Sequence, residues 1–197
     1  HLRLPRVLAG LILGVSLAAA GNVFQMIFSN PLVEPGFLGV SQGAAFGASL
    51  SIVVFGSSLW AVQASAAGFA LLGLAASYLF ARHFHFGGWV LRLILAGIAV
   101  SALFSSGVGI IKFVADPMSE LPEITFWMLG GLWAVSWRQT FSILPVFLVG
   151  TSLLFLFRWR LNLLSMDDRT AFSLGLAPFR ERILLLVSAT AITAAAI

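Results

Sequence analysis

Long apolar runs fill most of the chain, and short polar or charged segments separate them. A helix that crosses a membrane needs roughly 20 predominantly apolar residues. The runs therefore predict spans at about 5–28, 38–56, 59–81, 91–114 and 139–157, and the start of another from about 183. Pro31 and Pro35 break the chain between the first two spans. A tight, uncharged turn near 56–58 joins the second span to the third.

The segment 115–138 does not fit this pattern, because its first residues are too polar for a membrane span. Tryptophan is enriched at membrane–water interfaces, and the segment carries Trp127, Trp133 and Trp137. We expect a short interfacial or re-entrant helix there.

The segment 158–182 is amphipathic and charged. Asp167 or Asp168 can cap a helix N-terminus, Gly175 can end that helix, and Pro178 follows it. A short helix that lies on one surface of the membrane is therefore expected in this segment.

The composition excludes a water-soluble domain. Of 197 residues, 60% are hydrophobic and 9% are charged, with a mean hydropathy of +1.04. Soluble domains carry about 25% charged residues. Lipid requires backbone groups to pair within helices or closed barrels, and continuous rather than alternating apolar runs favour helices. The predicted fold class is all-α, a polytopic membrane helical bundle. The chain has no cysteine, which excludes disulfides and thiolate metal sites.

Lysine and arginine predict the orientation, because cytoplasmic loops carry an excess of both. Seven lie on one side of the predicted spans: Arg82, Arg92, Arg158, Arg160, Arg169, Arg180 and Arg182. Four lie on the other side: Arg3, Arg6, Lys112 and Arg138. The 158–182 side is therefore predicted to be cytoplasmic, together with the loop 30–37. The net charge of +4 comes from the ends of apolar runs, so it does not indicate nucleic-acid binding.

The stretch Gly39-Val40-Ser41-Gln42-Gly43 has the letters G-x-S-x-G, the nucleophile elbow of serine hydrolases. The α/β-hydrolases place Ser, then an acid, then His along the chain. No acid lies between Ser41 and His85, and no histidine follows His85. The elbow also needs a preceding strand, which an apolar helical pattern does not supply. The pattern argues against a hydrolase.

Small residues recur every four positions in two predicted spans. In the second span they form a small-x-x-x-small stripe that lets a neighbouring helix approach closely, and its members are Gly39, Gly43 and Gly47. In the fourth span they are Gly97, Ser101, Ser105 and Gly109. Two interpretations of this second stripe stay open, helix packing and a pore lining.

Two further groups of residues are candidate sites. His83 and His85 are two positions apart, so they do not share a helix face, and no third ligand is close in sequence. We predict no metal site. Arg3 and Arg6 lie one helical turn apart on the predicted outer side. They are either snorkelling anchors or a docking point for an acidic partner surface.

Three motifs together resemble one family. The first is R-x-x-R, then A-G-x-x-x-Q, then N-P-L-x-x-P-x-x-L-G, in RLPRVLAGLILGVSLAAAGNVFQMIFSNPLVEPGFLGVSQGAAFGA at 3–48. The others are FWMLGGLWAVSWRQTF at 126–141 and LNLLSMDDRTAFSLGLAPFRER at 161–182. These stretches resemble the iron-siderophore, haem and vitamin B12 permeases, the FecCD-type membrane subunits of type II ABC importers.

This resemblance implies a permease of ten transmembrane helices, of which the 197 residues cover about five to six as a partial transmembrane domain. The chain begins without Met and ends within an apolar run, so we expect a fragment, from the second helix to the start of the seventh. The family works as a homodimer or as a pair of homologous permeases. Its partners are a cytoplasmic ABC ATPase dimer and an extracytoplasmic solute-binding protein, in the cytoplasmic (inner) membrane of bacteria or archaea.

The resemblance also implies a function and residue roles. The permease imports an iron chelate, a ferric siderophore or haem, by alternating access, and cobalamin or an oxyanion is the alternative cargo. It holds no cofactor and has no catalytic site, because ATP and Mg²⁺ bind the ATPase. Docking of the binding protein falls to Arg3 and Arg6. The cytoplasmic gate is Asn30, Leu32, Val90 and Leu91, and the pore lining is the stripe of the fourth span. ATPase coupling falls to Thr170, Ala171, Phe172, Ser173, Leu174, Gly175 and Leu176.

The sequence departs from the family pattern at two places. Asp167 stands where the family usually has Gly, and Val90 and Leu91 stand where some relatives have small polar residues. The sequence argues against two other classes. An intramembrane enzyme needs ionisable groups within its spans, and the span interiors carry essentially none. A passive channel needs neither an ATPase contact nor a cytoplasmic amphipathic helix, so the segment 161–182 argues against it.

Overall fold

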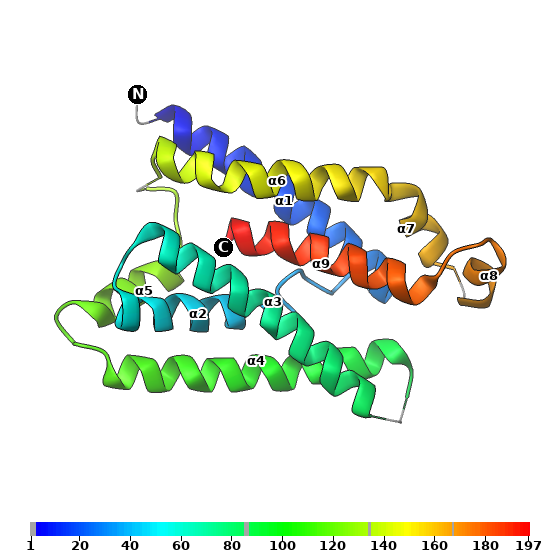
Figure 1. The fold of residues 1–197 in the computed structure, drawn as a ribbon, viewed down its shortest axis with the longest axis horizontal. Coiled ribbons are helices and arrows are strands. Elements are labelled where there is room, and N and C mark those ends of the chain that lie inside the picture. The colour runs from blue at the N-terminus through cyan, green and yellow to red at the C-terminus, as the bar shows by residue number, and fades with distance from the viewer. Residues whose placement is uncertain (1–2, 85–86, 134, 167) are drawn as a thin grey trace. The chain divides into compact units, whose positions relative to one another are not determined.

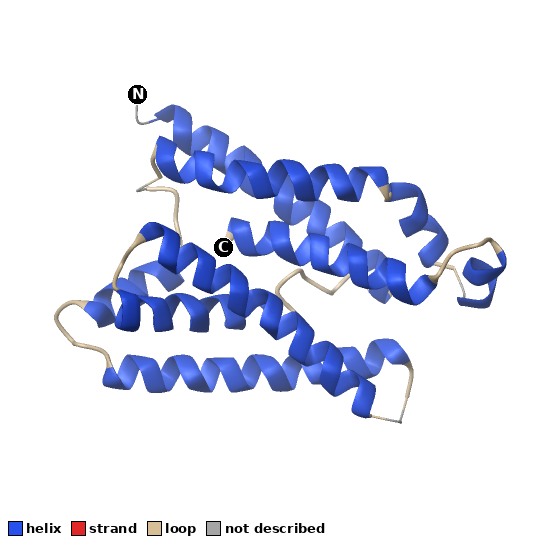
Figure 2. Ribbon diagram, viewed as in Figure 1, coloured by secondary structure: helices blue, strands red, loops and turns tan. Residues whose placement is uncertain are grey.

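The computed structural model of the protein describes residues 3–84, 87–133, 135–166 and 168–197. Every regular element in this part of the chain is a helix (Figures 1 and 2). The helices form two compact units, which are described separately below. The predicted all-α fold class is confirmed over the described residues.

The first unit contains the described residues of His1–Pro35 and Leu132–Ala196. Its helices are α1 (Arg3–Phe28), α6 (Trp137–Leu156), α7 (Arg158–Leu164), α8 (Asp168–Ser173) and α9 (Pro178–Ala196). Helix α9 packs against both α1 and α6, and α1 also contacts α6 and α7. The approach of α6 to α9 is close at Gly150, where an added Cβ atom would overlap the side chain of Ile192.

The second unit spans Gly36–Gly131. Its helices are α2 (Val40–Phe55), α3 (Leu59–His83), α4 (Trp89–Val114) and α5 (Glu120–Leu129). Helix α2 is central, since it packs against α3, α4 and α5. Three aromatic rings fill the space among α2, α3 and α4, those of Phe46, Phe69 and Phe104, with centroids 5.1 to 6.3 Å apart.

Four helices are long and apolar enough to cross a membrane: α1, α3, α4 and α6. The prediction of helical spans at these positions is confirmed. Helix α2 has 16 residues, about 24 Å at 1.5 Å per residue, which is shorter than the predicted 38–56. The reason is glycine at both ends: Gly39 has φ 79° and Gly56 has φ 74°, values that interrupt a right-handed helix.

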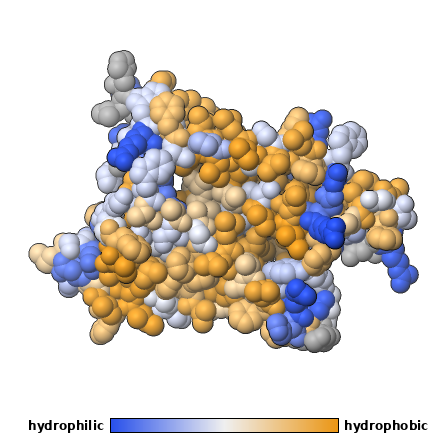
Figure 3. Space-filling model, in the orientation of Figure 1, coloured by the Kyte–Doolittle hydropathy of each residue, from blue (hydrophilic) through white to orange (hydrophobic). Residues whose placement is uncertain are grey.

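The outer surface of the long helices is largely hydrophobic, as Figure 3 shows for its visible face. Phe113 in α4 is 90% exposed, and many other large apolar side chains are exposed along α1, α3, α4 and α6. Soluble monomers rarely expose apolar area on this scale. The surface is that of helices whose surroundings are lipid.

The two unusual segments both contain helices. Helix α5 lies within 115–138, so the predicted short helix there is confirmed, and its depth in the membrane stays a prediction. The segment 158–182 was predicted to hold one short helix, but it holds α7, α8 and the start of α9. Helix α9 begins at Pro178 rather than at about 183. Proline suits the first helical position, where it loses no hydrogen bond.

Candidate functional sites

One end of the first unit carries the two arginines predicted to dock a binding protein. Arg3 and Arg6 are both exposed in the first turn of α1. The guanidinium group of Arg6 donates a hydrogen bond to the backbone carbonyl oxygen of Trp133. Nearby, the hydroxyl of Thr140 in α6 donates to the carbonyl oxygen of Pro5 at 3.4 Å. Arg6 is therefore oriented by the segment that precedes α6, which the sequence did not predict.

The chain leaves α1 through a left-handed turn. Ser29 has φ 48°, and its backbone N–H donates to the carbonyl oxygen of Met26 at 3.3 Å. The N–H of Asn30 donates to the carbonyl oxygen of Gln25 at 3.1 Å. This pair of bonds is the Schellman arrangement that satisfies the last carbonyl groups of a helix. The turn ends α1 before Pro31.

Asn30, a predicted gate residue, holds the next turn in place. Its side-chain oxygen accepts a 2.9 Å hydrogen bond from the N–H of Leu32, and its backbone oxygen accepts one of 3.3 Å from Val33. Leu32, the second predicted gate residue, is 84% exposed. Asn30 thus positions Leu32 on the surface of this unit.

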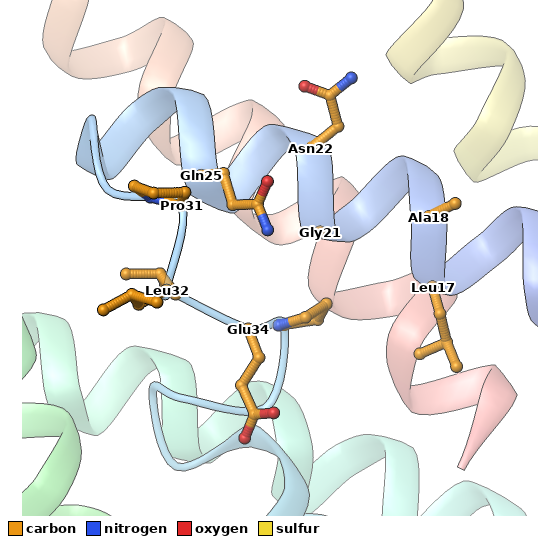
Figure 4. A pocket seen from close by; sticks show the side chains of 10 residues that line it. Leu17, Ala18, Gly21, Asn22, Gln25, Pro31, Leu32 and Glu34 are labelled. Carbon is orange, nitrogen blue, oxygen red and sulfur yellow. The ribbon is translucent and has the colours of Figure 1, made fainter.

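An open hollow of about 580 Å³ lies between this turn and the last part of α1 (Figure 4). Its polar lining comes from Asn22 and Gln25 of α1 and from Glu34 of the loop, all of them exposed. The described residues that line it include no Lys or Arg. The hollow therefore has acidic and amide character, and it offers no cation to a bound anion.

The segment predicted to couple to an ATPase lies at the end of the first unit opposite Arg3 (Figure 1). Thr170, Ala171, Phe172 and Ser173 are in α8, and Leu174, Gly175 and Leu176 form the turn that follows it. Ala171 is fully buried, whereas Phe172 is 72% exposed and Leu174 57%. Ala171 thus anchors α8, while the large apolar side chains of Phe172 and Leu174 stay exposed.

Gly175 ends α8, as predicted. It has φ 85°, and its N–H donates to the carbonyl oxygen of Phe172 at 3.0 Å. The N–H of Leu176 donates to Ala171 at 3.2 Å, which completes a second Schellman arrangement. Asp167, one of the predicted capping residues and a departure from the family pattern, lies outside the described residues. Asp168 is the first residue of α8.

An ion pair and a hydrogen bond join α7 and α9, the two helices that flank α8. Arg160 of α7 forms an ion pair with Glu181 of α9, and its guanidinium also lies 4.9 Å from the ring centroid of Phe157. Arg182 donates a 3.3 Å hydrogen bond to the carbonyl oxygen of Leu164, at the end of α7. The sequence did not predict this arrangement. Its only signal was the opposite charge at the two ends of the segment.

In the second unit, the glycines of the first stripe lie where α3 comes closest to α2. A Cβ atom at Gly43 would overlap the carbonyl oxygen of Phe69, and one at Gly47 would lie 2.5 Å from that of Ser65. Gly39 precedes α2, and a Cβ there would lie 2.8 Å from Val100 of α4. Ser41 is in the first turn of α2, and no strand precedes it in the described residues.

The second stripe does not stay on one face of α4. Gly97 is buried, and a Cβ atom there would lie 3.0 Å from the carbonyl oxygen of Phe37. Ser101 is half-buried, while Ser105 and Gly109 are exposed. Positions four apart drift by about 40° per step on a helix with 3.6 residues per turn, so the stripe turns about 120° from Gly97 to Gly109. Gly97 packs within this unit, and the pore-lining role of the stripe stays a prediction.

The remaining predicted gate residues, Val90 and Leu91, are in the first turn of α4. Val90 is half-buried and Leu91 exposed. The turn before them is held by Arg92, whose guanidinium donates to the carbonyl oxygen of Phe84 at 2.6 Å. Asn30 and Leu32 belong to the first unit and these two to the second, so a common gate stays a prediction.

The described residues contain no group of three His, Cys, Asp or Glu side chains that could hold a metal ion. The Nδ1 atom of His83 lies 3.0 Å from the carbonyl oxygen of Leu79 in its own helix. His85 lies outside the described residues.

Comparisons with known proteins agree with the sequence motifs. The model of the FecCD transport family matches residues 1–197. The chain is 40% identical over 188 residues to the molybdate import system permease protein MolB of Haemophilus influenzae, an alignment that covers 94% of this chain and 55% of the relative. It is 39% identical over 199 residues to the probable iron chelatin transport system permease protein of Helicobacter pylori, covering 100% and 59%.

A solved inward-facing structure of an ABC transporter assigned to the metal-chelate type is also similar. It has a TM-score of 0.90 and 37% identity, and the match covers 99% of this chain and 62% of that one. The chain spans somewhat more than half the length of the curated relatives named above. Since the family model matches from the first residue to the last, the chain belongs to the FecCD transport family.

Proposed function

We propose that the whole protein is the non-catalytic permease subunit of a binding-protein-dependent ABC importer in the cytoplasmic membrane of a bacterium or archaeon. The observation that carries this proposal is the form of the segment 158–182. A six-residue helix cannot hold itself in water, so α8 needs its anchor at Ala171 and its Schellman turn at Gly175. The exposed apolar side chains of Phe172 and Leu174, held in place by this anchor and turn, suit insertion into a cleft of another protein.

The distribution of groups along the first unit supports an importer. The arginines lie at one end and α8 at the other, as expected for a subunit that receives cargo outside and contacts an ATPase inside. The partners in this proposal are a solute-binding protein with acidic docking residues, a pair of ATPases that hold ATP and Mg²⁺, and a second permease copy or homologue. ATP binding then favours one ATPase arrangement, and α8 passes that preference to the membrane helices.

The proposed cargo is an iron chelate, a ferric siderophore or haem. A relative named for iron chelatin transport supports this choice. Molybdate is the second candidate, because a molybdate permease is 40% identical to the chain.

The test uses the full-length protein with its ATPase and binding protein in liposomes. We would measure ATP-driven uptake of ferric siderophores, haem, cobalamin and molybdate. The variant pair Arg3→Glu with Arg6→Glu should abolish uptake of one cargo, and the charge-conserving pair Arg3→Lys with Arg6→Lys serves as the matched control. Uptake of molybdate alone would contradict the iron-chelate proposal. Uptake of no cargo, with an ATPase that fails to co-purify, would contradict the importer proposal.

A further inference from the structure

We infer that Arg160 and Glu181 are positioning residues for coupling: their ion pair sets the position of α8, and with it the transfer of the ATPase signal. This inference rests on the proposed function. It concerns residues outside the predicted coupling set at 170–176 and assigns them a role in transport rather than in folding alone.

The ion pair of Arg160 with Glu181 lies at the two ends of the segment that contains α8. Arg160 is in the first turn of α7 and Glu181 in the first turn of α9, so the pair joins the helices on both sides of α8. The described residues between them include the rest of α7, all of α8 and the first residues of α9. The ion pair therefore closes the segment into a loop whose two ends are tied together.

Helix α8 lies in the chain between the two helices that the ion pair joins. It packs against α7 and α9, and the methyl group of Ala171 is fully buried. A helix of six residues contributes little stability of its own. The position of α8 thus follows the relative position of α7 and α9, which the ion pair holds.

A hydrogen bond also joins α9 to α7. Arg182, the residue after Glu181, donates to the carbonyl oxygen of Leu164, in the last turn of α7. Cationic side chains near a helix C-terminus satisfy its terminal carbonyl groups and interact favourably with its dipole. The start of α9 therefore contacts both ends of α7, its first turn through Glu181 and its last turn through Arg182. Two such contacts resist rotation as well as separation.

The chemistry of the pair suits positioning better than stabilisation. The side chain of Arg160 is 47% exposed and that of Glu181 14% exposed. An ion pair with one exposed partner, here Arg160, contributes modestly to folding, because solvent screens the attraction and both side chains lose freedom. The charge-assisted hydrogen bond nevertheless joins α7 to α9 at this point. Loss of the pair should leave the helices folded and weaken the connection between α7 and α9.

The experiment uses full-length permease with its ATPase and binding protein in liposomes, with ATP inside and the cargo found above outside. Arg160→Glu, Glu181→Arg and the double exchange are compared with wild type. The readout is the number of ATP molecules hydrolysed per cargo molecule imported. Each single reversal should raise this ratio about tenfold, and the double exchange should return it to within about twofold of wild type. Arg180→Glu is the matched control, since it changes the charge of the same helical turn equally and leaves the pair intact.

Single variants that keep the wild-type ratio would overturn the inference, and so would a double exchange that is as uncoupled as either single change. Glu181→Gln keeps the side-chain size and removes the charge, so it reports on the pair even if a reversal fails to fold, and it should raise the ratio about threefold. An unchanged ratio in Glu181→Gln would also overturn the inference. A wild-type complex that imports no cargo would instead contradict the proposed function itself.

Discussion

The side-chain hydroxyl of Ser65 in α3 donates a 2.7 Å hydrogen bond to the backbone carbonyl oxygen of Gly47 in α2. Gly47 has no Cβ atom, so α3 comes close enough to α2 for this contact. Ser77 of α3 makes a similar bond, since it donates to the carbonyl oxygen of Leu38, just before α2, at 2.9 Å. Small residues and hydroxyl groups therefore hold α2 against α3, in the manner known for helix pairs in lipid.

Replacement of Gly47 should separate these helices. In Gly47→Ala, the added methyl carbon would lie 2.5 Å from the carbonyl oxygen of Ser65 and 2.9 Å from the Cβ atom of Phe69. Backbone cannot yield as a flexible side chain does, so we expect a loss of about 1–3 kcal/mol in the free energy of unfolding. The measurement is unfolding of the full-length protein by SDS titration in mixed micelles.

Gly68 supplies the matched control. It lies in the same helix as Ser65, is exposed, and has no atom within 4 Å of the position of an added Cβ. Gly68→Ala should be neutral or stabilise α3 by up to about 1 kcal/mol, because alanine favours a helix over glycine. Equal destabilisation by the two substitutions would contradict the close approach at Gly47.

The left-handed conformation of Ser29 gives a second prediction. Its φ of 48° belongs to a region that glycine enters at little cost and other residues at a cost. Ser29→Gly should therefore raise the free energy of unfolding by up to about 1 kcal/mol, whereas Ser29→Val should lower it. Thermal unfolding of both variants in detergent checks the order. A destabilising Ser29→Gly together with a neutral Ser29→Val would argue against the turn.

The sequence predicted the positions of the helices, but it predicted only some of their ends. Pro178 begins α9 although the predicted span starts at about 183, because the charges of Arg180, Glu181 and Arg182 are typical of a segment outside the lipid. A helix can extend beyond its apolar part when its first turn lies outside the lipid. The break between α7 and α8 carries no Gly or Pro, so hydropathy and turn residues gave no sign of it.

The candidate sites could likewise be predicted only where their cause is local in the sequence. The end of α8 at Gly175 was predicted because glycine in that position has a local cause, the positive φ of a helix terminus. The pair of Arg160 with Glu181 joins residues 21 positions apart, and the bond of Arg6 to Trp133 joins residues 127 apart. Contacts of this kind depend on how the chain folds back, which periodicity within one helix does not report.

Asn30 gives a third prediction, at the turn that follows α1. Asn30→Ala removes the oxygen that accepts the N–H of Leu32, at a cost of about 0.5–1.5 kcal/mol to the turn. Asn30→Asp keeps an acceptor at the same place and should preserve it. Hydrogen exchange at the Leu32 amide should quicken several-fold in the alanine variant and stay near the wild-type rate in the aspartate variant. Equal exchange rates in all three proteins would show that the bond is not formed.

Asp116, between α4 and α5, gives a prediction on pH. The hydroxyl of Ser119, and next the backbone N–H of Met118, hold the pKa of its carboxyl below the ordinary value by donating to the ionised form. A lowered pKa stabilises the folded turn above the pKa of the unfolded chain, and this contribution disappears as pH falls through the folded pKa. Ser119→Ala should raise the pKa of Asp116, as NMR of the labelled carboxyl carbon can measure.

The control for this titration is Thr125→Ala. The hydroxyl of Thr125 donates to the carbonyl oxygen of Leu121 in its own helix, so its removal should leave the pKa of Asp116 unchanged. An unchanged pKa in Ser119→Ala would assign the lowering to Met118 and contradict the order of causes given above.

The last prediction concerns the tip of α8 and depends on the proposed function. Leu174 is exposed beside Phe172, and an apolar tip gains free energy only when a partner buries it. Leu174→Asp should lower ATP-driven uptake at least tenfold while the helices stay folded, since burial of a carboxylate in an apolar cleft is unfavourable. Leu174→Met conserves the apolar character and should retain most of the uptake. Uptake measured in liposomes with the full complex decides between these outcomes. Normal uptake in the aspartate variant would mean that the ATPase contacts another surface of the permease, and that α8 does not carry the signal.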